Sequence, residues 1–495
     1  MSQAVSQAAV FIGVNLTSDR VNAAAVTQEG LILAESSAPF AHKSAAGPKS
    51  VFLEENAEIW WDAVRMALGY LTSQLRKTTV PEQIKAVCVS GDPGILITTD
   101  RRGVPSRPAI LAEDTRGSDY IKQLNIHGRE HCEKQGFRFR PEDPLAKIAW
   151  LKENEPKLYE DALFIHQADY IIGHLKGQAN VTEFSFAART GADLLDECWP
   201  DWVDYDMYLG VREKLPRLTH LGEKVGTVTD KAAAATGLPA GSSVIMGTAT
   251  VSAAFLASGA RKTGDLHTVL SKHLTISGIS PVMIRSPQDL IRVNKLPNRM
   301  WSFSVVSQTG TEWINNWFSE GSFAELEHQA EKLLPSTYLA YPNVSKGETF
   351  PFTSNNAEGF ISPATDNRTV QFASCLQGTA LFERFCYQKL DRLAGTAETP
   401  GDIYTGGEWS GSDAWMQCRA DVTGRVNRRM NGRSSAAFGS AMIAALGSMF
   451  QTLEEAAAAM LSEDASFFPN PEKHSQYSEL YTNFCALMEE QGYIV

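Results

Sequence analysis

Three short apolar runs follow one another near the start of the chain, at residues 9–16, 21–27 and 31–36. Gln28-Glu29-Gly30 lies between the last two runs, and a glycine after polar residues favours a tight turn. Apolar runs joined by short turns predict consecutive antiparallel strands, so we expect a β-meander here. Further along, the spacing of apolar residues over 59–75 predicts a helix, and the run over 84–89 predicts a buried strand.

The length and the charge of the chain limit its organisation and its partners. A chain of 495 residues is too long for one hydrophobic core, because cores stop growing near ~250–300 residues, so we expect two large domains. The formal net charge of −12 argues against nucleic acid or an anionic membrane as a main partner. It does not argue against ATP, because nucleotide sites depend on local backbone amides.

The sequence shows no targeting segment, and we expect a cytoplasmic protein. Residues 1–5 carry no basic segment, and the apolar run 8–14 is too short for a signal peptide. The longest uncharged stretch, 434–450, is rich in Ala, Gly and Ser, which favours a buried helix over a membrane span. The seven cysteines are scattered without a CxxC pair, as is typical of proteins in a reducing compartment.

One group of residues has the spacing of a metal site. His127 and His131 are four residues apart, and Cys132 follows directly. Two histidines at this spacing on one helix can face the same metal ion. The charged residues around them instead favour a solvated helix, so we predict no protein-bound metal here.

Residues 244–255 read Val-Ile-Met-Gly-Thr-Ala-Thr-Val-Ser-Ala-Ala-Phe. They resemble a stretch of the FGGY carbohydrate kinases in which an apolar strand and a glycine turn precede Asp-Asn/Gln-x-Ala-Ala and a helix. Other segments resemble the same family in the same order, at 13–22, 59–63, 108–116, 147–156, 182–191, 236–241, 405–415 and 435–441. From these segments the chain is identified as a member of the FGGY family.

The resemblance implies the fold class, which is α/β with two ribonuclease-H-like (actin-like ATPase) domains facing a central cleft. It implies an N-terminal, sugar-binding domain over residues 1–246 and a C-terminal, nucleotide-binding domain over residues 247–495. The C-terminal helices are expected to return and pack near the hinge. In the family, sugar lies on the first domain and ATP on the second, and domain closure excludes water from the reaction.

Thr250 stands where the resemblance predicts an aspartate. In the family this aspartate is the general base that takes the proton from the sugar hydroxyl as it attacks ATP. A threonine hydroxyl has no useful basicity near neutral pH. No aspartate lies between Asp230 and Asp265, so a small shift of the alignment does not restore the base. We therefore expect the catalytic position at Thr250 to be inactive.

The first phosphate-binding segment also departs from the family pattern. Asn15, Thr17 and Ser18 match Asp, Gly and Thr of a hairpin whose Asp helps to hold Mg²⁺ and whose backbone amides approach phosphate. Asn15 lacks the charge that Mg²⁺ favours, and Thr17 places a side chain where a glycine leaves room. The family expectation of ATP and Mg²⁺ as cofactors is weakened here, and an ordinary hairpin without a ligand is an equal alternative.

Four further residues belong to the expected nucleotide side. Ser271 and Lys272 align with a turn that holds the transferred phosphate in the family. Lys272 can bind phosphate as a point charge, but we favour a plain strand pair with a polar bend. Gly406 and Gly407 match a glycine pair that passes close to the adenosine, and their alternative role is close packing at a turn.

The candidate substrate-binding residues are Asp92, Asp114 and Arg116. They match loops that line the sugar cleft in the family, and charged groups make strong hydrogen bonds to hydroxyls. For Asp114 and Arg116, an ion pair or a loop cap is an equal alternative. The loop around Asp92-Pro93-Gly94 departs from many relatives, so the sequence does not predict which sugar is bound.

Three functions are compatible with these residues. We favour a homologue whose family reaction is ATP-dependent phosphorylation of a ketose or polyol hydroxyl, with phosphotransfer weak or lost. The second is a working sugar kinase with an atypical site. The third is a non-catalytic sugar- or nucleotide-binding regulator, or a repurposed enzyme that uses residues such as Asp92, Lys272 or His273. Whether the chain is an active enzyme is left open, as is a homodimer; the expected ligand is a small sugar or polyol.

Overall fold

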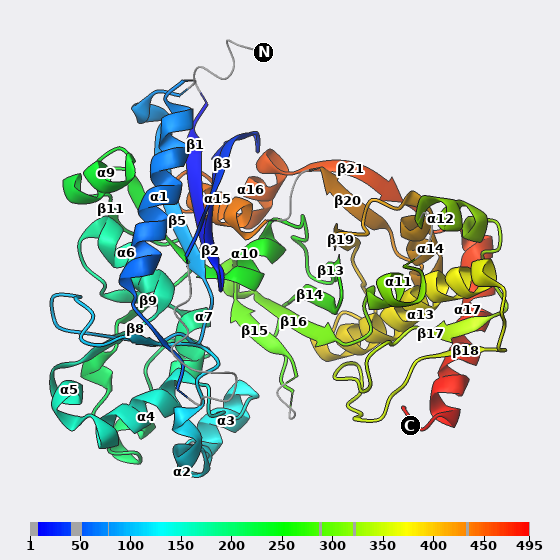
Figure 1. Ribbon diagram of the computed structural model, residues 1–495, viewed down its shortest axis with the longest axis horizontal. Helices are drawn as coiled ribbons and strands as arrows, with labels where there is room; N and C mark the ends of the chain where they lie inside the picture. Colours follow the sequence, from blue (N-terminus) through cyan, green and yellow to red (C-terminus); the bar gives the residue numbers. More distant parts are fainter. Residues whose placement is uncertain are drawn as a thin grey trace.

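The computed structural model describes residues 8–40, 52–77, 79–286, 290–319, 323–431 and 435–494. Two large β-sheets lie side by side along the long axis of the molecule, each with helices packed against it (Figure 1). Smaller strand pairs and helices extend the first half below its sheet (Figure 1). Within the described residues, no helix has the length and apolar character needed to span a bilayer.

The first sheet has six strands, in the spatial order β11 (Lys224–Thr227), β12 (Ser243–Ala249), β5 (Ile84–Gly91), β1 (Val10–Leu16), β2 (Arg20–Thr27) and β3 (Ile32–Pro39). β1, β2 and β3 are antiparallel neighbours, which confirms the predicted meander. β5 and β12 extend the sheet in parallel with β1. β1 is buried along its whole length because helices cover both faces of the sheet.

The second sheet has seven strands, in the spatial order β15 (Arg292–Lys295), β16 (Trp301–Ser307), β14 (Leu274–Ser280), β13 (Leu266–Leu270), β19 (Ile403–Gly407), β20 (Asn427–Asn431) and β21 (Ser462–Phe467). β13, β14 and β16 are antiparallel neighbours, with β15 inserted between β14 and β16 in the chain, and β19 and β20 again extend the sheet in parallel. The five central strands of the two sheets therefore share one spatial order and direction.

Helices cover both faces of the first sheet. On one face lie α1 (Glu58–Leu75), α6 (Gln167–Lys176) and α9 (Asp230–Thr236). On the other lie α10 (Thr250–Leu256), α15 (Ala436–Leu446) and α16 (Leu453–Met460). α15 and α16 come from the far end of the chain, so the C-terminal helices return to the first half, as expected. The predicted domain boundary at Gly247 falls inside β12, which runs on to Ala249.

Gly13 makes this return possible. A Cβ added at Gly13 would lie 1.9 Å from the Ala437 carbonyl oxygen and 2.4 Å from the Ala441 nitrogen. α15 therefore packs its backbone directly on β1, and any side chain at residue 13 would push it away.

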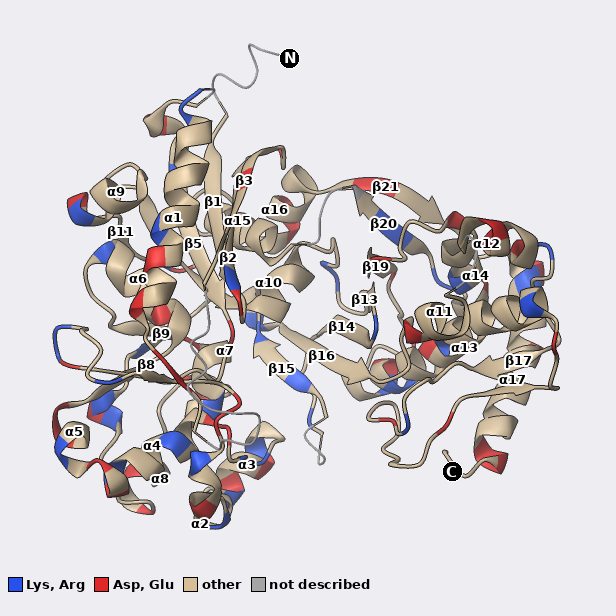
Figure 2. Ribbon diagram, viewed as in Figure 1, with Lys and Arg blue, Asp and Glu red and all other residues tan. Residues whose placement is uncertain are grey.

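The second sheet packs against a separate group of helices, which are α11 (Glu312–Trp317), α12 (Phe323–Glu331), α13 (Arg368–Ala394), α14 (Asp413–Thr423) and α17 (Pro471–Glu490). Inside this half, the Arg419 guanidinium makes a fully buried ion pair with Glu383 at 2.7 Å. Acidic and basic side chains are interspersed over both halves of the molecule (Figure 2).

Shorter elements complete the two halves. The strands are β4 (Glu54–Glu55), β6 (Ile97–Thr99), β7 (Ala109–Ile110), β8 (Leu163–Ile165), β9 (Val181–Glu183), β10 (Arg217–Thr219), β17 (Leu339–Tyr341) and β18 (Phe360–Ser362). The helices are α2 (Ile121–His127), α3 (Arg129–Gln135), α4 (Pro144–Asn154), α5 (Pro156–Asp161), α7 (Phe184–Ala187) and α8 (Trp202–Tyr205). Short 3-10 helices span Pro81–Gln83, Arg116–Tyr120, Ala188–Thr190, Arg212–Lys214 and Pro297–Arg299.

The expectation of one solvated helix around His131 is wrong. His127 ends α2 and His131 lies on α3, so the two histidines do not share a helix face. His131 and Cys132 are buried, and the His131 ring packs near Phe139 and Trp202. Burial lowers the pKa of His131 to about 4, which makes it a neutral core residue.

Candidate functional site

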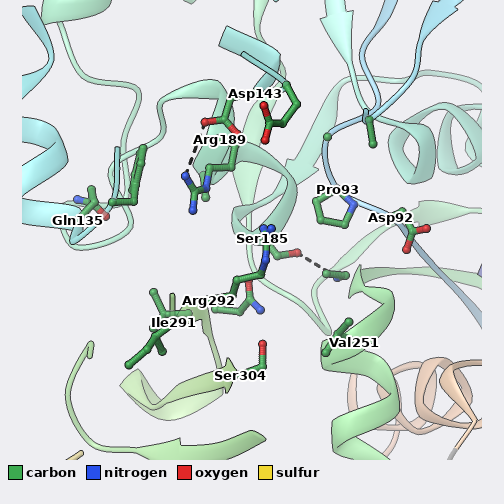
Figure 3. Close-up of a pocket in the computed structure, with 18 of the residues that line it drawn as sticks. Asp92, Pro93, Gln135, Asp143, Ser185, Arg189, Val251, Ile291, Arg292 and Ser304 are labelled. Atoms are coloured by element: carbon green, nitrogen blue, oxygen red, sulfur yellow. Dashed lines mark hydrogen bonds and ion pairs between the residues drawn. The ribbon is translucent and has the colours of Figure 1, made fainter. Parts of the chain in front are cut away.

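A cavity of about 450 Å³ lies between the loops of the first half and the β15–β16 edge of the second sheet (Figure 3). Its polar lining comes from several elements distant in the sequence, and includes Asp92, Glu113, Thr115, Gln135, Glu142, Asp143, Ser185, Arg189, Arg292, Asn294 and Ser304. This size suits a small ligand, because small-molecule pockets usually measure ~300–1,000 Å³. Of the three predicted substrate-binding residues, Asp92 lines the cavity.

Asp92 lies on a loop that is held on both sides. Pro93 follows it and restricts its backbone to extended conformations, and Gly94 takes a φ of 100°. The buried ammonium group of Lys147 donates hydrogen bonds to three backbone carbonyl oxygens, those of Gly94 at 2.9 Å, Leu111 at 2.7 Å and Ala112 at 3.0 Å. Lys147 therefore joins the Asp92 loop to the next loop of the cavity wall.

Thr250 is the first residue of α10, and its side chain is half-buried beside the cavity. Its hydroxyl donates to Asn15 Oδ1 at 3.0 Å and lies 3.4 Å from the Leu16 carbonyl oxygen. Asp92 lines the same cavity as Ala249 and Val251, the residues on either side of Thr250. Burial raises the pKa of Asp92 above its ordinary value, and the nearby Thr250 hydroxyl offsets part of that rise. The structure thus brings Asp92, Thr250 and Asn15 together.

A buried carboxyl group supports the start of α10 from behind. Glu183 Oε2 accepts hydrogen bonds from the Ser185 nitrogen at 2.9 Å and from the Thr248 hydroxyl at 3.2 Å. Ser185 Oγ also donates to Glu183, and it accepts from the Ala249 nitrogen at 3.0 Å (Figure 3). This network fixes the backbone directly before Thr250. Burial raises the pKa of Glu183 to about 7.

Asp114 and Arg116 lie beside the cavity wall rather than in its lining. Both side chains are fully buried, and Arg116 binds Asp114 through two nitrogens, at 2.9 Å and 2.7 Å. The Arg116 guanidinium also lies 4.7 Å from the Phe52 ring centroid and 4.8 Å from that of Trp150. The arrangement corresponds to the ion-pair alternative, and it shapes the loop whose residues Glu113 and Thr115 face the cavity.

The candidate nucleotide-side residues of the second half meet at one edge of its sheet. β13 and β19 are parallel neighbours with Leu270 opposite Gly407, so the turn at Ser271 and Lys272 lies beside Gly406 and Gly407. Ser271 Oγ donates to the His273 carbonyl oxygen at 2.6 Å, and Lys272 pairs with Glu312 at 3.1 Å. Gly407 has a φ of 99°, and a Cβ there would lie 2.4 Å from the Leu270 carbonyl oxygen. The glycine is therefore required for packing.

The β1–β2 hairpin carries the remaining phosphate-side candidates. Thr17 Oγ1 donates to Asp19 at 3.1 Å and to the Arg20 carbonyl oxygen at 3.0 Å, and Ser18 is exposed. Asp19 pairs with Arg20, whose hydrogen bond lowers the pKa of Asp19. The hairpin thus presents an anionic residue next to the end of β1.

Comparisons with known proteins agree with the shared strand order of the two sheets. The N-terminal domain model of the FGGY family of carbohydrate kinases matches residues 10–257, and the C-terminal domain model matches residues 281–448.

The chain belongs to the FGGY family of carbohydrate kinases.

Relatives in the FGGY family match over nearly the whole chain. The xylulose kinase of Bacillus subtilis is 25% identical over 495 residues, covering 95% of this chain and 96% of that protein. The L-xylulose/3-keto-L-gulonate kinase of Escherichia coli is 25% identical over 457 residues, covering 86% of each protein. The crystal structure of xylulose kinase from Rhodospirillum rubrum superposes with a TM-score of 0.80 at 23% identity, covering 97% of this chain and 98% of that one. The predicted two-domain fold is confirmed.

The FGGY family implies a nucleotide-bound Mg²⁺, and the residues at the end of β1 can be tested against it. Such an ion keeps several waters and needs one or two protein carboxylates. Asn15 provides a neutral oxygen that already accepts the Thr250 hydroxyl. Asn15 therefore offers such an ion a neutral amide oxygen where a carboxylate would be favoured.

Several cavity residues of this FGGY member were not singled out from the sequence. Ser185 and Arg189 line the cavity, and Glu183 lies behind Ser185. All three belong to the 182–191 segment that resembles the family, but the sequence did not predict their roles. Arg189 lies 3.6 Å from Asp143 in the cavity wall (Figure 3). Arg292 and Asn294 come from an edge strand of the second sheet, and only the folded chain brings them to the first half.

Proposed function

We propose that this chain binds a ketose or polyol in the cavity beside α10 and phosphorylates it from ATP only weakly. The observation that carries the proposal is Thr250, which begins α10 where the family pattern has its general base, with its hydroxyl bound to Asn15. Loss of a general base lowers a rate by ~10²–10⁴-fold. A hydroxyl donor at this position can orient a substrate, but it does not accept the proton.

The cavity supports the choice of ligand class. Carboxylate, guanidinium, amide and hydroxyl groups line it, and together they offer many donors and acceptors to a polyhydroxylated molecule. The names of the relatives, xylulose kinase and L-xylulose/3-keto-L-gulonate kinase, favour a ketose among the small sugars.

The nucleotide side supports slow transfer. Phosphoryl transfer depends on positioning and on neutralising the charge of the phosphates. The ammonium of Lys272 is paired with Glu312. The basic side chain of the β1–β2 turn, Arg20, is paired with Asp19, so neither cation is free for a phosphate. Adenosine binding near Gly406 and Gly407 is compatible with this arrangement, whereas tight phosphate binding is disfavoured.

Calorimetric titration tests the proposal, first with ATP·Mg²⁺ and then with a panel of pentuloses, hexuloses and polyols, while ADP release is followed in parallel. We expect binding of at least one sugar, with ADP release well below the roughly 1–100 s⁻¹ typical of kinases. Thr250→Asp, alone or with Asn15→Asp, should raise ADP release at least about tenfold. Thr250→Asn is the matched control, because it has nearly the same shape without the charge.

Two results would contradict the proposal. One is the absence of binding by every sugar and polyol in the panel. The other is sugar-dependent ADP release at ordinary kinase rates in the wild type, with no gain in Thr250→Asp. A working kinase is the second candidate, and the carboxyl group of Asp92 in the cavity lining beside α10 favours it.

A further inference from the structure

We propose that Asp92 is the catalytic base for the weak phosphoryl transfer that this chain performs, as a partial substitute for the carboxylate that residue 250 lacks. This rests on the proposed function, because it requires a sugar hydroxyl in the cavity to attack a nucleoside triphosphate. Two departures from the family pattern, at Thr250 and in the Asp92 loop, lie beside the same cavity, whose lining includes Asp92 and the two neighbours of Thr250. Thr250 replaces an acidic side chain of the family pattern, and Asp92 introduces one.

Asp92 lies between the cavity expected to hold the sugar and the hairpin expected to meet the phosphates of ATP. Asp92 lines the cavity at the end nearest the first turn of α10 (Figure 3). In that turn Thr250 donates a hydrogen bond to Asn15, near the carboxyl end of β1, where the hairpin expected to meet the phosphates begins. A base has to reach the sugar hydroxyl that attacks the phosphate, and a carboxylate between the cavity and the end of β1 can do so.

The other carboxyl groups of the cavity are placed differently. Asp143 Oδ2 accepts a hydrogen bond from the Arg140 nitrogen at 2.9 Å and lies near Arg189, so it is engaged at another wall (Figure 3). Glu113 is exposed, and Glu142 lies next to Asp143 in the chain. Asp92, in contrast, lies on the side of the cavity where Val251 of α10 is found (Figure 3).

Asp92 also has the environment of a base rather than of a surface carboxylate. Its loop is held by Pro93 and by the Lys147 bond to the Gly94 carbonyl oxygen at 2.9 Å. The Thr250 hydroxyl donates its proton to Asn15, so Asp92 keeps accepting capacity for a substrate hydroxyl. Partial burial makes the carboxylate a stronger proton acceptor than one in water.

The step balances as follows. The carboxylate of Asp92 takes the proton of a sugar hydroxyl, and the hydroxyl oxygen uses its electron pair to form a bond to the γ-phosphorus of the nucleoside triphosphate. The bond between that phosphorus and the bridging oxygen breaks, and its electron pair stays with the nucleoside diphosphate. The products are a sugar phosphate, a nucleoside diphosphate and a proton on Asp92, which is then released to solvent.

The test is Asp92→Asn in the full-length chain, with ATP·Mg²⁺ and the sugar that binds best in calorimetry. Asparagine keeps the size and a hydrogen-bonding oxygen but cannot take the proton. We expect kcat to fall by ~10²–10⁴-fold while the sugar Kd changes less than about threefold, and the acid limb of the pH profile to disappear. Asp62→Asn, an exposed carboxylate on α1, is the control and should keep wild-type turnover. Asp92→Asn combined with Thr250→Asp should recover turnover.

Three results would overturn the inference. The first is a sugar that binds to the wild type without any release of ADP; in that case the binding part of the proposed function stands while the role of Asp92 falls. The second is Asp92→Asn with weaker sugar binding and unchanged kcat, which would make Asp92 a binding residue alone. The third is an acid limb that persists in Asp92→Asn. Failure of every sugar to bind would instead remove the proposed function and this inference together.

Discussion

The Arg116 guanidinium donates two hydrogen bonds to the Asp114 carboxylate inside the first half. Their chain neighbours Glu113 and Thr115 line the cavity. Asp114 Oδ2 also accepts a hydrogen bond from the Leu53 nitrogen at 2.6 Å. The pair therefore joins the loop at the cavity wall to the segment before β4. Asp114 and Arg116 therefore fix the shape of the loop that carries Glu113 and Thr115.

Asp114→Asn should lower stability without a matching loss of sugar affinity. The change leaves Arg116 buried with the Glu54 contact at 2.8 Å as its remaining ion pair. Breaking a buried pair costs ~3–5 kcal/mol, and the retained contact favours the lower end. Urea unfolding followed by fluorescence measures the change, with Asp62→Asn as an exposed control. A large loss of sugar affinity at unchanged stability would instead identify Asp114 as a ligand-binding residue.

The pH dependence of turnover should carry the signature of Asp92. Burial raises its pKa above 3.8, and the nearby Glu113 carboxylate raises it further, while the nearby Thr250 hydroxyl lowers it. A base works in its deprotonated form, so kcat/KM should fall as the pH drops through this raised pKa. Glu113→Gln removes a like charge and should move the acid limb to lower pH. A limb that stays in place or moves upward would contradict this assignment.

Asp169 should make the protein less stable as the pH rises. It is fully buried, and burial raises its pKa to about 8 from 3.8. The folded state therefore holds a proton that the unfolded chain releases, and the unfolding free energy falls with pH between these values, by ~1.4 kcal/mol per unit at most. Asp169→Asn should reduce the slope measured by urea unfolding from pH 5 to 7. In this variant the unfolding free energy should still fall with pH, because burial also raises the pKa of Glu183 to about 7.

Two Gly→Ala changes should have opposite effects. At Gly13 the new methyl group would lie 1.9 Å from the backbone of α15, so Gly13→Ala should destabilise the protein by ~1–3 kcal/mol or more. Gly69 lies within α1 and an added Cβ meets nothing within 4 Å. Gly69→Ala should therefore stabilise by ~0.5–1 kcal/mol, because alanine favours the helix. Thermal unfolding measures both, and equal shifts would contradict the proposed contact between α15 and β1.

Much of the local structure was predictable because its signal lies within a few residues. The meander at residues 9–36, the helix over 59–75 and the strand beginning at Ile84 match β1 to β3, α1 and β5. The polar bend at 271–273 and the buried helix within 434–450 were also predicted correctly over the described residues. α4 ends at Asn154 and Pro156 opens α5, because proline suits the first position of a helix.

The sequence alone determined the family and the order of its elements, because apolar periodicity and turn residues act over short distances and the matching segments keep their order. It also determined that residue 250 is a threonine without a useful basicity. Only the tertiary structure decided that Asp92 lines a cavity beside α10, that Asp114 and Arg116 form an ion pair with each other, and that Arg292 lines the same cavity. Those relationships arise when loops from distant segments are packed together, and the spacing of residues along the chain carries no record of them.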